Sequence, residues 1–498
     1  MATPRTKKDQ IRLRRLLADL GYGQAEREDR ASFKRRFHPV AEHVRAFDPD
    51  VALVVGERGT GKSALFRAVF ENGLLPALAR HAPAPRLPSG APERTQWVQA
   101  YPMHRGFPDA FGLRRCLEGD GGERALKLWF AYLIRALADQ TERVEGLAGP
   151  ALSSMVKSPG ASPSEVLQAF DEAEHEPLVL LDRIDERLEH EDRWLFVGYD
   201  ELDTLGGYDW DVMRQALRGL IGFWASYARR WRRLRVKLFL RTDLFRRHAH
   251  FGGADLAKLA ANRAELTWSD RNLFAMLIKR IANTDDDLFA YCRAGKVPFV
   301  EPDDPDLGHV PKLLQAQEAR PLIERMLGQY MGAGAKKGRT FTWVLDHLRD
   351  ARRHVAPRNL VRLFEQAATK EQANQKARVP KLLHPTALRQ ALEDVSADHV
   401  QQGINNEWPW LYGVKKRVNG NLMPMDRREF RERLTADWDS SWGSQPDLRP
   451  PVDSPAELID YLLELGVVRE RTRDRVDVPD VYLYGLGLKR KGGVRKGS

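Results

Sequence analysis

A glycine-rich turn between an apolar run and a helical run constrains this chain more than any other feature. Residues 51 to 63 read Val-Ala-Leu-Val-Val-Gly-Glu-Arg-Gly-Thr-Gly-Lys-Ser, a β-type run that ends in the pattern GxxxxGK[ST]. Glycines lack a Cβ, so this turn can adopt positive φ and point successive backbone N–H groups at phosphate oxygens. The residues predicted to form the nucleotide-binding loop are Gly56, Glu57, Arg58, Gly59, Thr60, Gly61, Lys62, Ser63 and Ala64.

The last residues of the turn predict two further roles. We expect Lys62 to contact the β- and γ-phosphates, and Ser63, which opens a predicted helix, to offer its hydroxyl to Mg²⁺. The alternative is an accidental glycine-rich turn, which ordinary residue frequencies would produce in roughly two of every hundred chains of this length. The apolar strand directly before the turn and the amphipathic helix directly after it favour the phosphate site.

A second motif places two carboxylates at the end of another apolar run. Residues 195 to 203 read Leu-Phe-Val-Gly-Tyr-Asp-Glu-Leu-Asp. In P-loop NTPases an acid at the end of a neighbouring parallel strand holds Mg²⁺, and Asp200 fits that position. Glu201, one residue further on, is the candidate that orients and deprotonates the attacking water. A solvated strand end is the alternative reading of these acids.

Length, cysteine content and hydropathy limit the class of protein. A chain of 498 residues is too long for one core, and about three domains are expected. Two cysteines, Cys116 and Cys292, exclude a disulfide framework and lack neighbours of metal-ligand spacing, so packing roles in a reducing compartment are predicted. No apolar run approaches the roughly eighteen residues that span a bilayer. Because the N-terminus also lacks a signal-type hydrophobic stretch, we predict a cytoplasmic protein without a membrane partner.

The charge is mixed, with a modest basic excess. The formal net charge is +11, from 80 basic and 69 acidic residues. The excess is concentrated at residues 34 to 36, at 229 to 235, and in a tail that contains Lys489, Arg490, Lys491, Arg495 and Lys496. Such clusters can follow a nucleic acid backbone, although runs of charge are more often solvated faces. Nucleic acid is therefore an open alternative as a partner.

The remaining pattern predicts an α/β fold with helical additions. Further strands are expected at 96 to 101, at 235 to 240 and at 264 to 268, with the polar sequence Arg241-Thr242-Asp243 closing the second of these. The expected domains are a basic helical segment (1–50), a core (51–268) with a helical insertion (104–193), a helical lid (269–377) and a C-terminal domain (378–498). In the last, a helix over 455–465 and β-type residues over 476–484 resemble a helix followed by a β-wing.

Taken together, the phosphate loop, the Asp200–Glu201 strand end, the polar end at Arg241 and the segment Ala356-Pro357-Arg358 resemble an AAA+ ATPase of the origin-recognition and STAND-like branch. More narrowly, Phe-Leu-Arg-Thr-Asp-Leu-Phe, Pro-Arg-Asn-Leu and the closing Val-Pro-Asp-Val-Tyr-Leu-Tyr-Gly-Leu-Gly are similar to bacterial P-loop ATPases of prokaryotic anti-phage systems. The resemblance implies a P-loop parallel sheet with a helical insertion, a lid and a winged-helix-like C-terminal domain.

The resemblance also implies cofactors, roles and partners. ATP and Mg²⁺ would be the cofactors, Thr242 or Arg241 would contact the γ-phosphate as sensor 1, and Arg358 would do so as sensor 2. A homo-oligomer is implied, together with an effector protein encoded nearby. The arginine finger that would couple neighbouring subunits stays open among Arg263, Arg246 and Arg247. Preference for ATP over GTP cannot be read from the residues.

Three functions follow as expectations. The first is a Mg-ATP-dependent switch or motor that gates an effector in anti-phage defence. The second is a DNA-binding ATPase of replication-initiator or transposition-loader type. The third is a degenerate P-loop protein that binds nucleotide without turnover.

Overall fold

The computed structural model describes residues 6–491 except 22–27, 83–85, 87–91, 103–109, 118–120, 145–147, 151, 154–160, 207–208, 228, 252–256, 258, 375–376, 407, 437, 439–449, 451, 453 and 473. The chain forms two compact units, Ala25–Thr267 and Met1–Gln24 with Trp268–Ser498. Each has its own buried apolar cluster. The domain bounds expected from the sequence stay a prediction.

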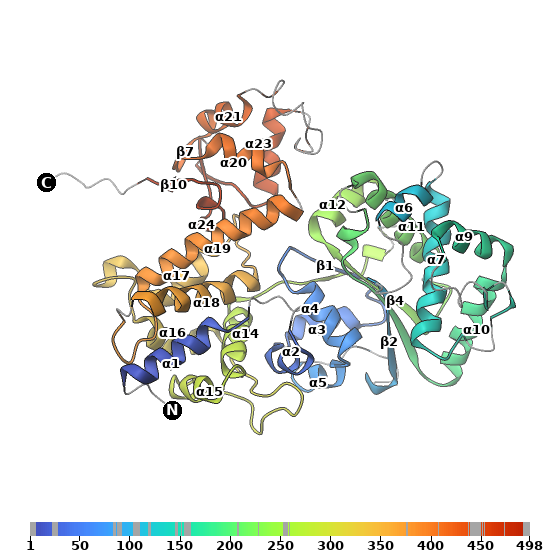
Figure 1. The fold of residues 1–498 in the computed structure, drawn as a ribbon, viewed down its shortest axis with the longest axis horizontal. Helices are drawn as coiled ribbons and strands as arrows, with labels where there is room; N and C mark the ends of the chain where they lie inside the picture. The colour runs from blue at the N-terminus through green and yellow to red at the C-terminus, as the bar shows by residue number, and fades with distance from the viewer. Residues whose placement is uncertain are drawn as a thin grey trace. The chain divides into compact units, whose positions relative to one another are not determined.

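The first unit is built on a five-stranded parallel sheet, coloured blue to green in Figure 1. Its spatial order is β2-β3-β4-β1-β5, and each pair of neighbouring strands in it is parallel. The carboxyl ends of all five strands therefore meet at one edge, where ligands bind in open parallel sheets. The strands are β1 (Leu53–Gly56), β2 (Thr95–Tyr101), β3 (Trp194–Tyr199), β4 (Leu234–Arg241) and β5 (Ala264–Glu265).

Helices cover both faces of this sheet, as the sequence pattern predicted for a parallel α/β fold (Figure 1). On one face, Phe66 packs edge-on against Phe239 of β4 with ring centroids 5.4 Å apart. On the other, Trp129 packs against Tyr199 of β3 at 5.5 Å. The described helices of the unit are α2 (Arg30–Arg36), α3 (Ala41–Val44), α4 (Lys62–Phe66), α5 (Leu75–Ala79), α6 (Ala110–Leu117), α7 (Gly121–Gln140), α9 (Pro163–Glu172), α10 (Glu176–His190), α11 (Trp210–Tyr227) and α12 (Thr242–Phe251).

The second unit begins as a helical domain that includes the N-terminal helix. In α1 (Lys7–Ala18), the guanidinium of Arg14 is buried and its Nε donates to the Leu382 carbonyl at 2.6 Å. Ser269 caps α14 (Asp270–Ala282), since its side chain accepts from the Asn272 N–H at 3.2 Å. The other long elements are α15 (Asp286–Ala294), α16 (Arg320–Leu327), α17 (Thr340–Asp346), α18 (Pro357–Asn374) and α19 (Pro385–Asn406).

The last part of this unit has the helix and β-wing that the sequence predicted. Helix α23 (Pro455–Glu464) leads into the hairpin β8 (Arg469–Thr472) and β9 (Arg475–Asp477), and β7 (Met425–Asp426) completes an antiparallel three-stranded sheet. Helix α20 (Leu411–Val418) precedes β7 in the sequence, and α21 (Arg427–Thr435) follows it directly. A separate parallel pair joins β6 (Leu422–Met423), which precedes this sheet in the sequence, to β10 (Lys489–Arg490), which follows it.

One expectation for this region is wrong. Residues 476–484 do not form a continuous strand, because β9 ends at Asp477 and α24 (Asp480–Leu483) follows. Pro479 lies between them, and proline has no N–H to extend a ladder but is well suited to lead into a helix.

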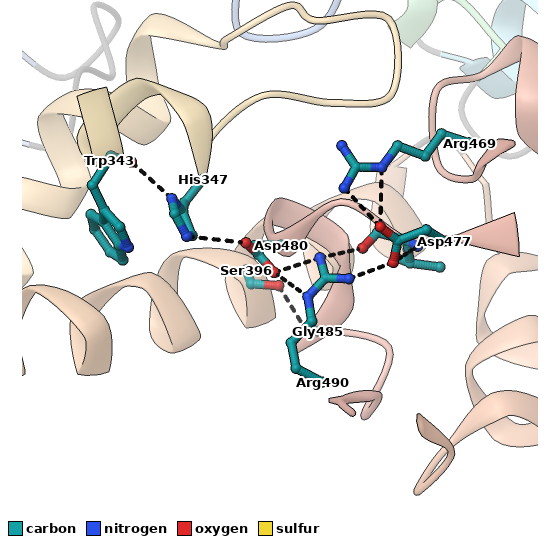
Figure 2. A network of polar contacts seen from close by, with 9 residues as sticks. Trp343, His347, Ser396, Arg469, Asp477, Asp480, Gly485 and Arg490 are labelled. Carbon is teal, nitrogen blue, oxygen red and sulfur yellow. Dashed lines mark hydrogen bonds and ion pairs between the residues drawn. The ribbon is translucent and has the colours of Figure 1, made fainter. Parts of the chain in front are cut away.

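The basic tail is partly built into the fold. Arg490 donates to two carboxylates, to Asp477 at the end of β9 and, from Nε at 2.8 Å, to Asp480 at the start of α24 (Figure 2). Arg469 of β8 reaches Asp477 as well, at 2.7 Å. Much of the charge of Arg490 is therefore neutralised within the fold. Residues 492–498, with Arg495 and Lys496, lie outside the described residues. No described helix combines the length and apolar character needed to cross a membrane.

Candidate nucleotide-binding and hydrolysis site

The glycine-rich turn connects β1 to α4. Gly59 and Gly61 have φ of 72° and 94°, values that side-chain-bearing residues rarely adopt. A Cβ at Gly56 would lie 2.5 Å from Oγ1 of Thr60, whose hydroxyl donates to the Glu57 carbonyl at 2.7 Å. The loop therefore depends on glycine at these three positions.

Lys62 is the first residue of α4, and its side chain folds back onto the loop. Its Nζ donates to the carbonyls of Gly56 and Glu57 at 2.9 and 3.0 Å. Burial lowers the pKa of the ammonium, although the nearby carboxylate of Asp200 opposes that effect. An ammonium that donates to two neutral carbonyls is well placed to exchange them for charged phosphate oxygens.

Asp200 follows β3 and faces the loop. Its side chain is buried, and that burial raises its pKa to about 6, while a hydrogen bond from Ser63 and the charge of Lys62 act in the other direction. Strand β4 separates β1 from β3, so the loop and the acid meet across the carboxyl end of β4. The structure thus brings together Lys62, Ser63 and Asp200, which are far apart in the sequence.

Glu201 has a left-handed backbone, with φ of 52°. For a residue with a side chain such a conformation costs on the order of 1–3 kcal/mol and persists only where the surroundings hold it. Here the Glu201 carbonyl accepts two hydrogen bonds from Thr204, from the backbone N–H at 2.9 Å and from Oγ1 at 2.8 Å. Thr204 in turn contacts the Tyr101 hydroxyl. The sequence did not predict roles for Thr204 and Tyr101, since no motif marks them.

The polar end of β4 carries Arg241, whose side chain is buried between two carboxylates. Its guanidinium contacts Asp203 at 3.0 Å and Asp243 at 2.7 Å. It also contributes to the lowered pKa of Lys62, so the two cations interact. Thr242 begins α12 directly afterwards. The choice between Arg241 and Thr242 as γ-phosphate sensor stays a prediction.

The residues predicted to sense nucleotide from outside the two motifs belong to both units of the chain. Arg358 belongs to α18 of the second unit, where its Nη1 contacts Gln402 at 3.4 Å. Among the arginine-finger candidates, Arg263 pairs with Glu265 at 2.8 Å, Arg246 is exposed on α12, and the side chain of Arg247 lies outside the described residues. The sensor 2 role of Arg358 and the choice of arginine finger also stay predictions.

The basic run at residues 229–235, which leads into β4, forms ion pairs with acids of α10 and of the turn after α10. Asp185 accepts from three consecutive backbone N–H groups, those of Arg232, Arg233 and Leu234, at 2.7–2.8 Å. Guanidinium groups of the run form three ion pairs, Arg230–Asp182, Arg232–Glu189 and Arg233–Asp192. This run therefore fixes the start of β4, and much of its charge is neutralised within the fold.

No protein-family model matches this sequence, and no characterised protein matches it in sequence. Among solved structures, it is similar to the ORC2 protein of Aeropyrum pernix in ADPNP–ADP complexes, with 13% identity, a TM-score of 0.42, and coverage of 92% of this chain and 97% of that chain. The ADP form of the same ORC2 protein is 12% identical, with a TM-score of 0.33 and coverage of 91% of this chain and 94% of that chain. Cdc6p from Pyrobaculum aerophilum is 13% identical, with a TM-score of 0.29 and coverage of 87% of this chain and 86% of that chain. At these values the likeness does not extend to activity, and the case for nucleotide chemistry rests on the loop itself.

Proposed function

We propose that the chain is a Mg-ATP-dependent ATPase that works as a nucleotide-driven switch. The observation that carries the proposal is the meeting of two sequence-distant motifs, since the buried carboxylate of Asp200 lies close enough to Ser63 and Lys62 of the phosphate loop for both to lower its pKa. An accidental glycine turn would have no reason to lie against a buried acid. The resemblance of these motifs to AAA+ ATPases supports ATP as the nucleotide.

The residues present suit magnesium. A serine hydroxyl and a carboxylate are the hard oxygen ligands that Mg²⁺ prefers beside phosphates, so Ser63 and Asp200 would hold it. When bound, the ion would neutralise charge on the β- and γ-phosphates. Its charge would also favour the ionised form of Asp200, which burial alone disfavours.

Each remaining residue of the loop edge has a defined task. The N–H groups of the loop and Lys62 would bind the phosphates and spread the charge that develops at the γ-phosphate. Glu201 would orient the attacking water and accept its proton. Arg241 would respond to the γ-phosphate by leaving one of its two carboxylates.

Two substitutions test binding and turnover separately. Lys62→Ala is expected to remove nucleotide binding, and Glu201→Gln to leave affinity within about twofold while lowering turnover at least a hundredfold. Affinity is measured with a fluorescent ATP analogue and turnover by phosphate release. Glu189→Gln, which changes an exposed acid of α10, is the matched control. Unchanged affinity in Lys62→Ala, or wild-type turnover in Glu201→Gln, would contradict the proposal.

For the biological setting we favour a cytoplasmic defence ATPase that gates an effector and assembles with copies of itself. The support is the resemblance of residues 239–245, 357–360 and 478–487 to such ATPases.

The DNA-loader alternative is weakened because Arg230, Arg232, Arg233 and Arg490 are paired with carboxylates. ATPase activity that duplex DNA stimulates, and that falls steeply with salt, would favour the loader. Dependence on a neighbouring gene product would favour the gated ATPase, and sizing with a non-hydrolysable ATP analogue tests assembly.

A further inference from the structure

A chain of hydrogen bonds runs from the edge strand β2 to the backbone of Glu201. The Tyr101 hydroxyl lies 2.7 Å from Oγ1 of Thr204, and that oxygen lies 2.8 Å from the Glu201 carbonyl. A carbonyl oxygen can only accept, so the one proton of the threonine hydroxyl points at Glu201. Tyr101 must therefore be the donor to Thr204, which fixes the direction of the whole chain.

Tyr101 is itself held firmly. It is the last residue of β2, its side chain is only 8% exposed, and its ring packs edge-on against Trp129 with centroids 6.1 Å apart. Burial, together with the charge of Glu201, raises the pKa of the phenol, so the hydroxyl stays protonated and able to donate. Tyr101 is thus a rigid donor rather than a surface side chain that happens to lie nearby.

The same residue also contacts the other acid of the motif. The backbone N–H of Asp200 donates to the Tyr101 carbonyl at 2.9 Å. One residue of β2 therefore fixes Asp200 through its main chain and Glu201 through its hydroxyl and Thr204. Between these two anchors the chain turns from an extended strand to the left-handed conformation of Glu201.

We propose that Tyr101 and Thr204 are positioning residues, which hold Glu201 in its left-handed conformation so that its carboxylate meets the attacking water. The inference rests on the proposed ATPase function and assigns it two residues that no motif identifies. Neither residue touches the nucleotide in this scheme. Their loss should therefore lower the turnover number and leave nucleotide affinity intact.

The variants remove one hydroxyl at a time. Tyr101→Phe and Thr204→Val are each expected to lower kcat about tenfold or more, with the Kd of a non-hydrolysable ATP analogue unchanged within twofold. Thr204→Ser keeps the hydroxyl and should retain most of the activity. The double variant should be little worse than Thr204→Val alone, because both residues act through one chain of hydrogen bonds.

The matched control removes a hydroxyl from the other end of β2, the strand that ends at Tyr101. Thr95 accepts from Nε1 of Trp97 at 2.8 Å at the start of β2, so Thr95→Val should change the melting temperature as much as Thr204→Val without the loss of kcat. A second control adds Tyr101→Phe to Glu201→Gln. Since Tyr101 acts only through Glu201, the residual turnover should not fall further.

The outcomes separate the two proposals. A wild-type protein that binds but does not hydrolyse ATP refutes the ATPase function, and the positioning role falls with it. An active wild type whose Tyr101→Phe and Thr204→Val variants are equally active refutes the positioning role alone. Weakened nucleotide binding in these variants, or a further loss in the Glu201→Gln background, would also overturn it.

Discussion

Arg490→Met should destabilise the C-terminal part of the second unit, because it removes a cation from a buried pair. The Asp477 side chain is 1% exposed and accepts from both Arg490 and Arg469, as Figure 2 shows. Removing one partner of a buried ion pair typically costs about 3–5 kcal/mol. Since Arg469 and the Val478 N–H still contact Asp477, we expect the lower end, about 3 kcal/mol, or a fall in melting temperature of about 6–12 °C.

The stability difference between wild type and Arg490→Met should also depend on pH. Burial favours the neutral acid, but hydrogen bonds and charges from Arg469 and Arg490 outweigh it, so the pKa of Asp477 is lowered. A lowered carboxyl pKa stabilises the fold above the unfolded pKa of about 4 and loses that effect as pH falls through the folded value. The difference between wild type and Arg490→Met should therefore be largest near neutral pH and narrow below about pH 4.

The assay is calorimetric unfolding with Lys489→Met, an exposed neighbour in β10, as control. Added nucleotide should identify the transition of the other unit, because ligand binding raises only the stability of the unit that binds. Adding Asp477→Asn to Arg490→Met should recover part of the loss, since the buried side chain that lost Arg490 then carries no charge. A melting temperature within 1 °C of wild type (about 0.3 kcal/mol), or a double variant less stable than the single, would refute the reasoning.

Three further changes probe the first unit. Gly56→Ala places a Cβ 2.5 Å from Thr60 Oγ1 and should weaken nucleotide binding at least tenfold in a titration, with partial rescue by Thr60→Ala; undiminished affinity would contradict the loop geometry. Gly198→Ala directs a Cβ to 2.3 Å from the Phe70 ring and should cost about 1–3 kcal/mol in denaturant unfolding. Asp185→Ala leaves three backbone N–H groups without their acceptor and should cost at least about 2 kcal/mol, whereas a neutral result would show that water replaces the carboxylate.

Local patterns in the sequence were enough to predict the strands and the loop. The apolar runs before Gly56 and Asp200 form β1 and β3, because strands buried on both faces need near-continuous apolar residues. The β-type reading of residues 476–484 failed because alternating apolar residues on both sides of Pro479 mimic a strand that the proline interrupts.

Long-range partners were not predictable in the same way. The charge runs looked available for phosphate because the sequence shows which residues are charged but not which carboxylates face them. Asp182 and Asp185, some fifty positions before the run they bind, became its partners only through the packing of α10 beside β4. The partners of Arg490 could not be predicted for the same reason, since they lie on β9 and α24.

The sequence by itself determined the chemistry of the loop, since glycine, lysine and serine at fixed spacing suit phosphate whatever surrounds them. Only the tertiary structure decided that Asp200 lies against Ser63, because the order of strands in the sheet sets which carboxyl ends meet. It also decided that Tyr101 and Thr204 hold Glu201. A hydrogen bond needs two atoms within about 3 Å of each other, and residues a hundred positions apart come that close only when the chain is folded.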